Sequence, residues 1–366
     1  MPPPATPTCL LIADDLTGAC DAAVQFAMRG YGTVVRVDSQ PEAQVDIVAV
    51  STASRSMERS MLRGVFEAAA RRFPAARLVF KKIDSTLRGN VGAEVALAAE
   101  AFGCKAALIT PAFPAMNRTV DAGILRVAGA DFAPIDLAAY WREQGLLGCA
   151  HVAPGGVSAA LAAGARFISV DASRDSDLDA IAAAGLASQR RILWAGSAGL
   201  ASALARALPR GPQPQARRLG GFAAALFCLG SDHAVAIEQA RNLAAARAAL
   251  ALNAEDAAPE RIADALSRGV HVALRIPYGR IGAERVRQLI GEARPPLFLS
   301  GGDTASLVCR ALGVREIRLW DEIAPGIPRG VLAGGLFDGA PVVTKAGGFG
   351  APDALIHIAD SFTCPS

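Results

Sequence analysis

The chain has few aromatic residues and four histidines, and none of them forms a recognisable site. Aromatic residues make up 5% of the 366 residues, and no basic tract is interleaved with them, so the usual signature of nucleic-acid binding is missing. The histidines are dispersed and stand in no HExxH or CxxC context, which argues against a zinc site. The sequence also lacks a GxSxG turn, which excludes the nucleophile elbow of a serine hydrolase.

Strong charge and long apolar runs are also missing. The net charge of +3 is small for this length, and no apolar run reaches the roughly 20 residues of a membrane helix. The start, MPPPATPT, lacks the basic and apolar regions of a signal peptide. Seven cysteines without CxxC pairs or regular spacing predict free thiols. We therefore expect a cytoplasmic protein that binds small molecules and neither nucleic acid nor membrane, with homo-oligomer formation left open.

What the chain does have is a regular alternation of apolar runs and Ala-rich helical stretches. Hydrophobic residues make up 52% of a chain that is long enough for two domains. The alternation predicts an α/β fold of two three-layer domains with largely parallel sheets. The segment LPRGPQPQARRLGG, residues 208–221, predicts a linker, because Pro, Gln and Arg dominate it. We place the first domain at residues 1–210 and the second at residues 219–366.

The expected elements follow from the same pattern. In the first domain the predicted strands are residues 9–13, 45–50, 78–83, 106–110, 167–170 and 192–194, and the predicted helices include residues 56–73 and 91–102. In the second domain the predicted strands are residues 223–229, 270–276, 297–300 and 342–345, and the predicted helices are residues 234–249, 259–268, 283–293 and 305–312.

Two adjacent carboxylates, Asp14 and Asp15, follow the first predicted strand directly, with Thr17 behind them. In open α/β sheets, ligands bind at the carboxyl ends of the strands, where loops lead into helices. One Asp would cap the following helix, and the other would accept a hydrogen bond from a substrate hydroxyl or hold a cation. A dinucleotide-binding fold would have GxGxxG here, and that motif is absent.

A second polar cluster follows the strand at residues 78–83. Lysine and arginine beside hydroxyl donors at a helix start form an anion pocket suited to a substrate carboxylate. The alternative is a solvated loop with a Ser or Thr helix cap. Arg55, Asn117 and Arg118 follow other predicted strands at the same edge of the sheet. The polar residues of the cluster are Lys81, Lys82, Asp84, Ser85, Thr86, Arg88 and Asn90.

The second domain has three Gly-containing turns after strands, in CLGSDH, SGGDTA and TKAGGFG. Glycine lets backbone N–H groups converge on a phosphate, and the start of a helix favours negative charge. A tight turn is the alternative for any one of them. Three such turns in one domain favour a phosphate-rich ligand, although none has the GxxxxGK[ST] pattern of a Walker A motif.

With these segments in view, the chain resembles the four-carbon acid sugar kinase family, which phosphorylates tetronates such as threonate, erythronate and 3-oxo-tetronate. The segments that carry the resemblance occur in the family's order and span nearly the whole chain. Two departures stand out: the chain is shorter than many relatives, mainly in the second domain, and Ala346 and Gly348 replace polar residues of a Ser-Gly-Asn-Phe-Gly run. The segments are IADDLTGACD, SRS, KKIDSTLRGNVG, PAFPAMNRTV, LGSDHAVAIEQ, SGGDTA and TKAGGFG.

The resemblance implies an ATP- and Mg²⁺-dependent kinase that phosphorylates the terminal hydroxyl of a four-carbon sugar acid. It assigns residues 1–210 to the sugar acid and residues 219–366 to the nucleotide, with Asp14 and Asp15 as catalytic residues and the Mg²⁺ ligands unassigned. An NAD-dependent sugar-acid dehydrogenase and a sugar-acid-binding protein without kinase activity stay open as alternatives. The implied substrate contacts are Asp14, Arg55, Lys82, Asp84, Ser85, Thr86, Arg88 and Arg118, and the implied nucleotide contacts are Ser231, Gly301, Gly302, Asp303, Thr304, Gly347, Gly348, Phe349 and Gly350.

Overall fold

The computed structural model describes residues 7–37, 45–74, 76–129, 132–211, 221–291 and 293–363. The chain forms two compact units, one from residues 1–33 and 42–213 and the other from residues 34–41 and 214–366. The predicted boundaries at 210 and 219 flank residues 212–220, which lie outside the described residues together with most of the predicted linker.

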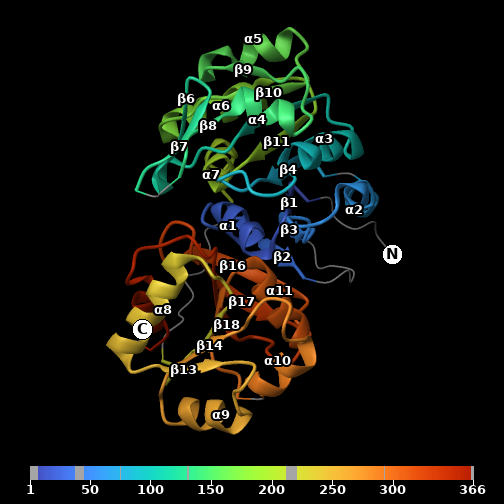
Figure 1. The fold of residues 1–366 in the computed structure, drawn as a ribbon. Coiled ribbons are helices and arrows are strands. Elements are labelled where there is room, and N and C mark those ends of the chain that lie inside the picture. Colours follow the sequence, from blue (N-terminus) through green and yellow to red (C-terminus); the bar gives the residue numbers. More distant parts are fainter. Residues whose placement is uncertain are drawn as a thin grey trace. The chain divides into compact units, whose positions relative to one another are not determined.

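The first unit is built on a parallel sheet with the strand order β3-β1-β4-β11-β5-β10-β9 (Figure 1). Strands β1, β5 and β11 are buried along their whole length, as the continuous apolar runs predict for a sheet covered on both faces. The strands are β1 (Cys9–Ala13), β3 (Ile47–Ser51), β4 (Leu78–Lys82), β5 (Ala106–Thr110), β9 (Ala150–Val152), β10 (Phe167–Val170) and β11 (Ile192–Gly196).

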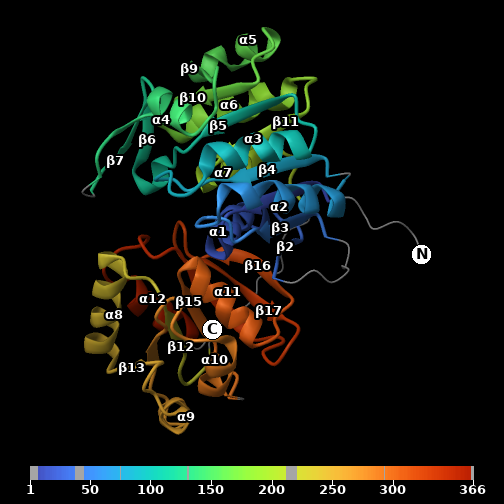
Figure 2. The same ribbon diagram turned by 45° about the vertical axis from the view of Figure 1, so that its right-hand side comes forward.

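Helices cover both faces of this sheet and complete a three-layer α/β unit (Figure 2). On one face α1 (Leu16–Ala27) packs on α7 (Ala198–Ala207), and α7 packs on α6 (Asp175–Ala187). On the other face α2 (Arg59–Arg72) packs on α3 (Val91–Ala101). The remaining elements are η1 (Pro114–Met116), β6 (Arg118–Asp121), β7 (Ile124–Val127), β8 (Ile135–Asp136), α4 (Leu137–Glu143), η2 (Pro154–Gly156) and α5 (Val157–Ala162), of which β6, β7 and β8 form a small antiparallel sheet.

The second unit has a mixed sheet, which begins with the parallel order β13-β14-β12-β15-β18. The sequence did not predict the antiparallel strands that follow, β17, β16 and residues 34–36 of β2. Pairing with β16 places residues 34–36 in this unit, whereas the sequence-based boundary put them in the first domain. The strands are β2 (Thr33–Arg36), β12 (Leu226–Leu229), β13 (Leu250–Asn253), β14 (Val272–Arg275), β15 (Leu297–Ser300), β16 (Glu316–Glu322), β17 (Pro328–Ala333) and β18 (Pro341–Lys345).

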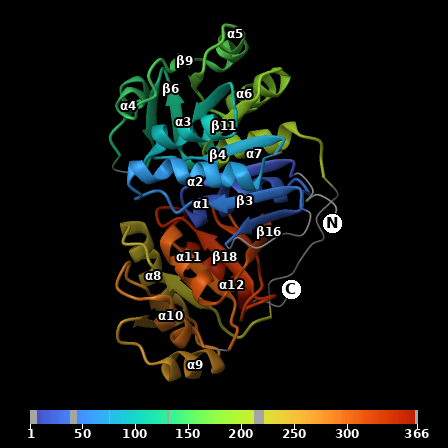
Figure 3. The ribbon, with the colours of Figure 1, turned by 90° about the vertical axis from the view of Figure 1, so that its right-hand side faces the viewer.

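Helices flank this sheet on both sides as well (Figure 3). One pair, α8 (Ala234–Arg247) and α12 (Ala354–Thr363), shares an apolar core with the strands, in which the rings of Phe227 and Phe298 lie 5.4 Å apart. On the other side α9 (Pro259–Ser267), α10 (Ala283–Ile290) and α11 (Gly302–Ala311) pack in sequence. Each unit is therefore a three-layer α/β structure, as predicted.

Both sheets contain a point at which neighbouring strands lead to helices on opposite faces. In the first unit, β1 leads to α1 and its neighbour β4 leads to α3. In the second unit, β12 leads to α8 and its neighbour β15 leads to α11. Ligands of open α/β sheets bind at such switch points, outside the carboxyl ends of the strands. The polar and Gly-rich segments singled out in the sequence follow these strands.

No helix in the described stretches combines the length and apolar character that crossing a bilayer requires. The six cysteines of the described residues are free thiols, as predicted, and Cys364 lies outside the described residues.

Candidate active site

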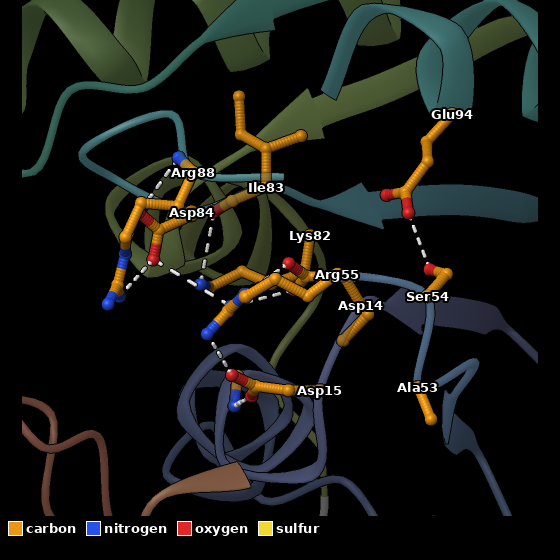
Figure 4. A network of polar contacts seen from close by, with 12 residues as sticks. Asp14, Asp15, Ala53, Ser54, Arg55, Lys82, Ile83, Asp84, Arg88 and Glu94 are labelled. Atoms are coloured by element: carbon orange, nitrogen blue, oxygen red, sulfur yellow. Dashed lines mark hydrogen bonds and ion pairs between the residues drawn. The ribbon is translucent and has the colours of Figure 1, made fainter. Parts of the chain in front are cut away.

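Asp14 and Asp15 leave the end of β1 in different directions and have different partners (Figure 4). Asp15 is the N-cap residue of α1, since its Oδ1 accepts hydrogen bonds from the backbone N–H of Gly18 at 2.5 Å and from the Thr17 hydroxyl at 3.1 Å. A Cβ at Gly18 would lie 3.0 Å from the same oxygen, so glycine keeps this turn uncrowded. Asp14 makes no cap and is the carboxylate left for other chemistry.

Arg55, from the loop after β3, ties the two carboxylates together. Its Nε and Nη2 donate to the two oxygens of Asp14 at 2.7 and 3.0 Å, and its Nη1 forms an ion pair with Asp15. Its Nη2 also lies 3.7 Å from Asp84 Oδ1. Burial lowers the pKa of Arg55, but the three carboxylates outweigh burial and raise it above its ordinary value. Arg55 therefore stays cationic, and 29% of its side chain is exposed to solvent.

Asp84 anchors the loop after β4. It accepts hydrogen bonds from the Nε and Nη2 of Arg88 at 3.0 and 2.7 Å and from the Thr86 hydroxyl at 2.5 Å. Burial raises the pKa of Asp84, but the hydrogen bonds and charges of Arg88 and Arg55 hold it well below its usual range. Arg88 keeps 58% of its side chain exposed, so its outer surface is open to a ligand.

The sequence correctly placed Lys82 at this edge but missed its partner, Asp21. Lys82 Nζ donates to the Ile83 carbonyl at 3.1 Å and lies 3.7 Å from Asp21 Oδ2. Burial raises the pKa of Asp21 to about 6, and its Oδ1 is buried without a hydrogen-bond partner among the described residues. The available signal was a carboxylate between Cys20 and Ala22, the only charged residue of a mainly apolar helix.

Arg118 opens β6 and has the acidic side chains of Asp84 and Asp21 in its electrostatic surroundings. Burial lowers the pKa of its guanidinium. Ser85 is buried next to Asp84 in the same loop. The structure thus gathers the predicted substrate contacts around β1, β3, β4 and β6 within the first unit.

The sequence placed Lys81 in the anion pocket after β4, but in the structure its side chain does not lie there. Its side chain is fully buried and its Nζ forms an ion pair with Glu94 of α3 at 2.8 Å. Glu94 also accepts a hydrogen bond from Ser54 at 2.5 Å (Figure 4). Successive residues of a strand point to opposite faces, so only Lys82 faces the site. Lys81 instead holds the loop that carries Arg55.

Two non-glycine residues in these loops adopt left-handed backbone conformations. Ala53, two residues before Arg55, has φ +50°, and Leu87, next to Arg88, has φ +63°. Such conformations cost free energy and persist only when the surrounding contacts impose them. Both loops are therefore held in specific shapes, each beside an arginine of the site.

In the second unit, the predicted Gly-rich turns approach one another closely. A Cβ on Gly347 would lie 1.9 Å from the Ser231 hydroxyl, and one on Gly348 would lie 3.1 Å from His233 Nε2. Gly301 has φ +94°, and a Cβ there would lie 3.7 Å from the Ser231 backbone nitrogen. The turns after β12, β15 and β18 therefore converge at the switch point of this sheet. Only glycine fits at position 347, and the positive φ of Gly301 favours glycine there as well.

The other predicted nucleotide contacts surround these turns. Gly302 begins α11, and Asp303 is exposed in its first turn. Thr304 is buried, and a Cβ on Gly230 would lie 1.6 Å from its hydroxyl, so Thr304 packs against that backbone. Gln239 of α8 donates to the carbonyls of Phe349 and Gly350 at 3.0 and 3.1 Å.

Comparison with known proteins follows the same division of the chain. The family described as a sugar-binding N-terminal domain matches residues 9–146 and 132–204, and the family described as a nucleotide-binding C-terminal domain matches residues 225–355. A D-threonate kinase from Bordetella bronchiseptica is 36% identical, with 96% of each chain covered. A D-threonate kinase from Salmonella typhimurium is 33% identical, covering 96% of this chain and 99% of the relative.

A solved structure from Haemophilus influenzae has the same fold, with a TM-score of 0.69 at 21% identity over 95% of this chain and 98% of that chain. At this identity the likeness concerns the fold alone. The two domain matches cover most of the chain in the predicted order, and relatives above 30% identity cover nearly all of it. The chain therefore belongs to the four-carbon acid sugar kinase family.

Proposed function

We propose that this protein transfers the γ-phosphoryl group of ATP to the terminal hydroxyl of a four-carbon sugar acid, with D-threonate as its substrate. The relatives named D-threonate kinase are 33–36% identical to this chain, whereas a D-erythronate kinase is 26% and the 3-oxo-tetronate kinases are 27–29% identical. The observation that carries the proposal is the Arg55 cluster, in which buried carboxylates adjoin partly exposed guanidinium groups.

The two kinds of group in this cluster suit the two ends of a sugar acid. Arg88 and Arg55 expose guanidinium surface, and a guanidinium binds a carboxylate through two parallel hydrogen bonds. Asp14 is oriented by Arg55 and is free of the helix cap, so it is the proposed acceptor of the hydroxyl proton. Asp15 supports it by fixing the start of α1.

We assign the phosphates of ATP to the turns of the second unit. Gly301, Gly347 and Gly348 allow backbone N–H groups to approach a phosphate, and α8 and α11 begin beside them. Phosphoryl transfer depends mainly on alignment and on neutralising charge.

Mg²⁺ would enter with the nucleotide. Among the described residues no three Asp, Glu, His or Cys side chains gather into a metal site, and Mg²⁺ commonly uses one or two carboxylates together with phosphates and water. Asp303, exposed beside the Gly301 turn, fits that donor set. A bound Mg²⁺ would neutralise phosphate charge. We place the reaction in the cytoplasm, as expected from the sequence.

An ADP-release assay with ATP and Mg²⁺ tests the proposal. D-threonate, L-threonate, D-erythronate and a 3-oxo-tetronate are supplied separately, and the phosphorylated carbon is identified by NMR. We expect the highest kcat/KM with D-threonate and a phosphate on the terminal oxygen. Absence of ADP release with all four acids would overturn kinase activity, and NADH formation from the same acids with NAD would support the dehydrogenase alternative. Preference for another acid would overturn the substrate assignment alone.

A further inference from the structure

Lys345 ends β18 directly beneath the Gly-rich turn at residues 346–350, and only 1% of it is exposed. It is paired in register with Ser300 at the end of β15, so the two side chains point to the same face of the sheet. The hydroxyl of Ser300 is buried and has no hydrogen-bond partner among the described residues. Two buried polar groups therefore lie side by side at the switch point of the second unit.

Among the described residues, the ammonium group of Lys345 has backbone partners and no carboxylate partner. Its Nζ donates to the carbonyls of Ala346 and Gly347 at 3.0 and 3.1 Å, and within the described part of the chain no acidic group forms an ion pair with it. The other buried lysines differ in this respect, because Lys81 pairs with Glu94 at 2.8 Å and Lys82 lies 3.7 Å from Asp21.

A buried cation without a counter-charge is costly for the folded protein, and the cost favours the neutral amine. Burial lowers the pKa of Lys345 to about 7, with no charged neighbour contributing to the shift. A neutral amine has two N–H groups, which is enough for the two carbonyls. The backbone around Lys345 is held by close contacts. The Gly301 N–H donates to the Lys345 carbonyl at 3.1 Å, and Gly347 packs against Ser231.

On the basis of the proposed function, we infer that Lys345 is a positioning residue for the nucleotide. Its side chain holds the carbonyls of the Gly-rich turn, and its positive charge lies beneath this turn, where the phosphates neutralise it. The ligand class is therefore a polyphosphate anion, which provides the counter-charge that the described residues around Lys345 do not provide. Binding of the anion favours the protonated lysine, so each binding event takes up a proton when the solution is above neutral pH.

Isothermal titration calorimetry with ADP at pH 8.0, in HEPES and in Tris, measures this proton uptake through the difference in buffer ionisation heat. At this pH the nucleotide phosphates are already ionised, so their own titration contributes little. We expect an uptake of about 0.5–1 proton per ADP bound to the wild-type protein. Lys345→Met should abolish the uptake and raise the Kd for ADP about tenfold or more.

Two further variants separate charge from structure. Lys345→Arg keeps a charge that does not titrate, so it should bind ADP more tightly than Lys345→Met and without proton uptake. Lys105→Met, which removes an exposed lysine of the first unit, is the matched control and should behave as wild type. Thermal unfolding of each variant reports whether it is folded, and the wild-type measurement stands even if Lys345→Met fails to fold.

Wild-type protein that binds ADP with the same heat in both buffers would overturn the inference and leave the proposed function intact. A folded Lys345→Met variant that takes up the same proton on binding ADP would also overturn the inference. Wild-type protein that binds neither ADP nor ATP would instead overturn the nucleotide assignment on which the inference rests.

Discussion

Arg55 contacts three carboxylates, and its position explains why two acids can stand side by side at the end of β1. The carboxylates of neighbouring Asp residues would repel each other, but the guanidinium of Arg55 pairs with Asp14 and Asp15 and lies 3.7 Å from Asp84. The acids thereby avoid the cost of burial without a counter-charge. Asp15 is further committed to the cap of α1, so the two acids differ through a local hydrogen bond, while both share the positive charge of Arg55 from the loop after β3.

Asp14→Asn should lower kcat/KM for the sugar acid by a factor on the order of 10²–10⁴, because the amide cannot accept the hydroxyl proton. The fold should stay intact, since Asn is close in size to Asp. Steady-state kinetics with thermal unfolding of the same samples checks both points.

The matched control is Asp179→Asn, which makes the same change in an exposed ion pair with Arg206. It should leave kinetics and stability nearly unchanged. Near-normal turnover by Asp14→Asn would remove Asp14 as the proton acceptor.

Asp21 should make the stability of the first unit depend on pH. Its pKa is about 6 in the folded protein and 3.8 in the unfolded chain, so the folded state binds more protons between these values. The stabilisation of the folded state by protonation of Asp21 is present in full below about pH 4 and is lost as the pH rises through 6. At pH 7.5 the Asp21→Asn variant should be more stable than wild type, by on the order of 2–3 kcal/mol.

Urea unfolding at pH 4.5, 6.0 and 7.5 tests this prediction through the difference in free energy of unfolding between variant and wild type. The difference should grow with pH across the series. A constant difference at all three pH values would show that Asp21 titrates alike in the folded and unfolded states.

At the scale of elements, the site depends on turns that pack with little free space. The turn after β18 passes so close to Ser231 that a Cβ at Gly347 would lie 1.9 Å from its hydroxyl. In the first unit the ion pair of Lys81 with Glu94 joins β4 to α3, and Ser54 extends it to the loop after β3. Strand ends and helix starts thus position the polar groups through buried contacts.

Gly347→Val should raise the Kd for ADP at least tenfold and leave sugar-acid binding nearly unchanged, because the added side chain displaces Ser231 and the turn. Calorimetry with each ligand measures both effects. Gly282→Ala is the control in the same unit, since a Cβ there meets no atom of the described residues within 4 Å. Equal loss of both ligands, with a large drop in unfolding temperature, would mean that the substitution destabilises the protein generally.

At the scale of the whole molecule, each unit has its own core, its own run of parallel strands and its own switch point. A ligand stabilises the region that it binds by RT ln(1 + [L]/Kd), about 2.7 kcal/mol at a hundredfold excess over Kd. Two ligands with separate sites should therefore protect separate parts of the chain.

Hydrogen–deuterium exchange should show this separation directly. D-threonate should slow exchange in the loops after β1, β3 and β4, and ADP should slow exchange in the turns after β12, β15 and β18, because the proposed contacts lie there. Protection of the second unit alone by both ligands would contradict the assignment of the sugar acid to the first unit.

Local pattern was sufficient for much of this architecture. The apolar runs predicted β1, β5, β10 and β15 with the observed bounds, because parallel strands buried on both faces have continuous apolar sequences. The helices at α8 and α9 were predicted from their first residues, with small errors at their ends. The polar and Gly-rich segments were correctly placed at strand ends, since strand and helix lengths determine which residues form the connections.

Tertiary structure decided what depends on partners distant in the sequence. Pairing of residues 34–36 with β16 and the antiparallel course of β17 have no local signal. The burial of Lys81 against Glu94 depends on α3, and the counter-charge for Asp14 and Asp15 depends on Arg55. The residue types at the site were therefore set by the sequence, whereas their pairing and burial, and hence their charge states, were set by contacts that form only when the sheet assembles.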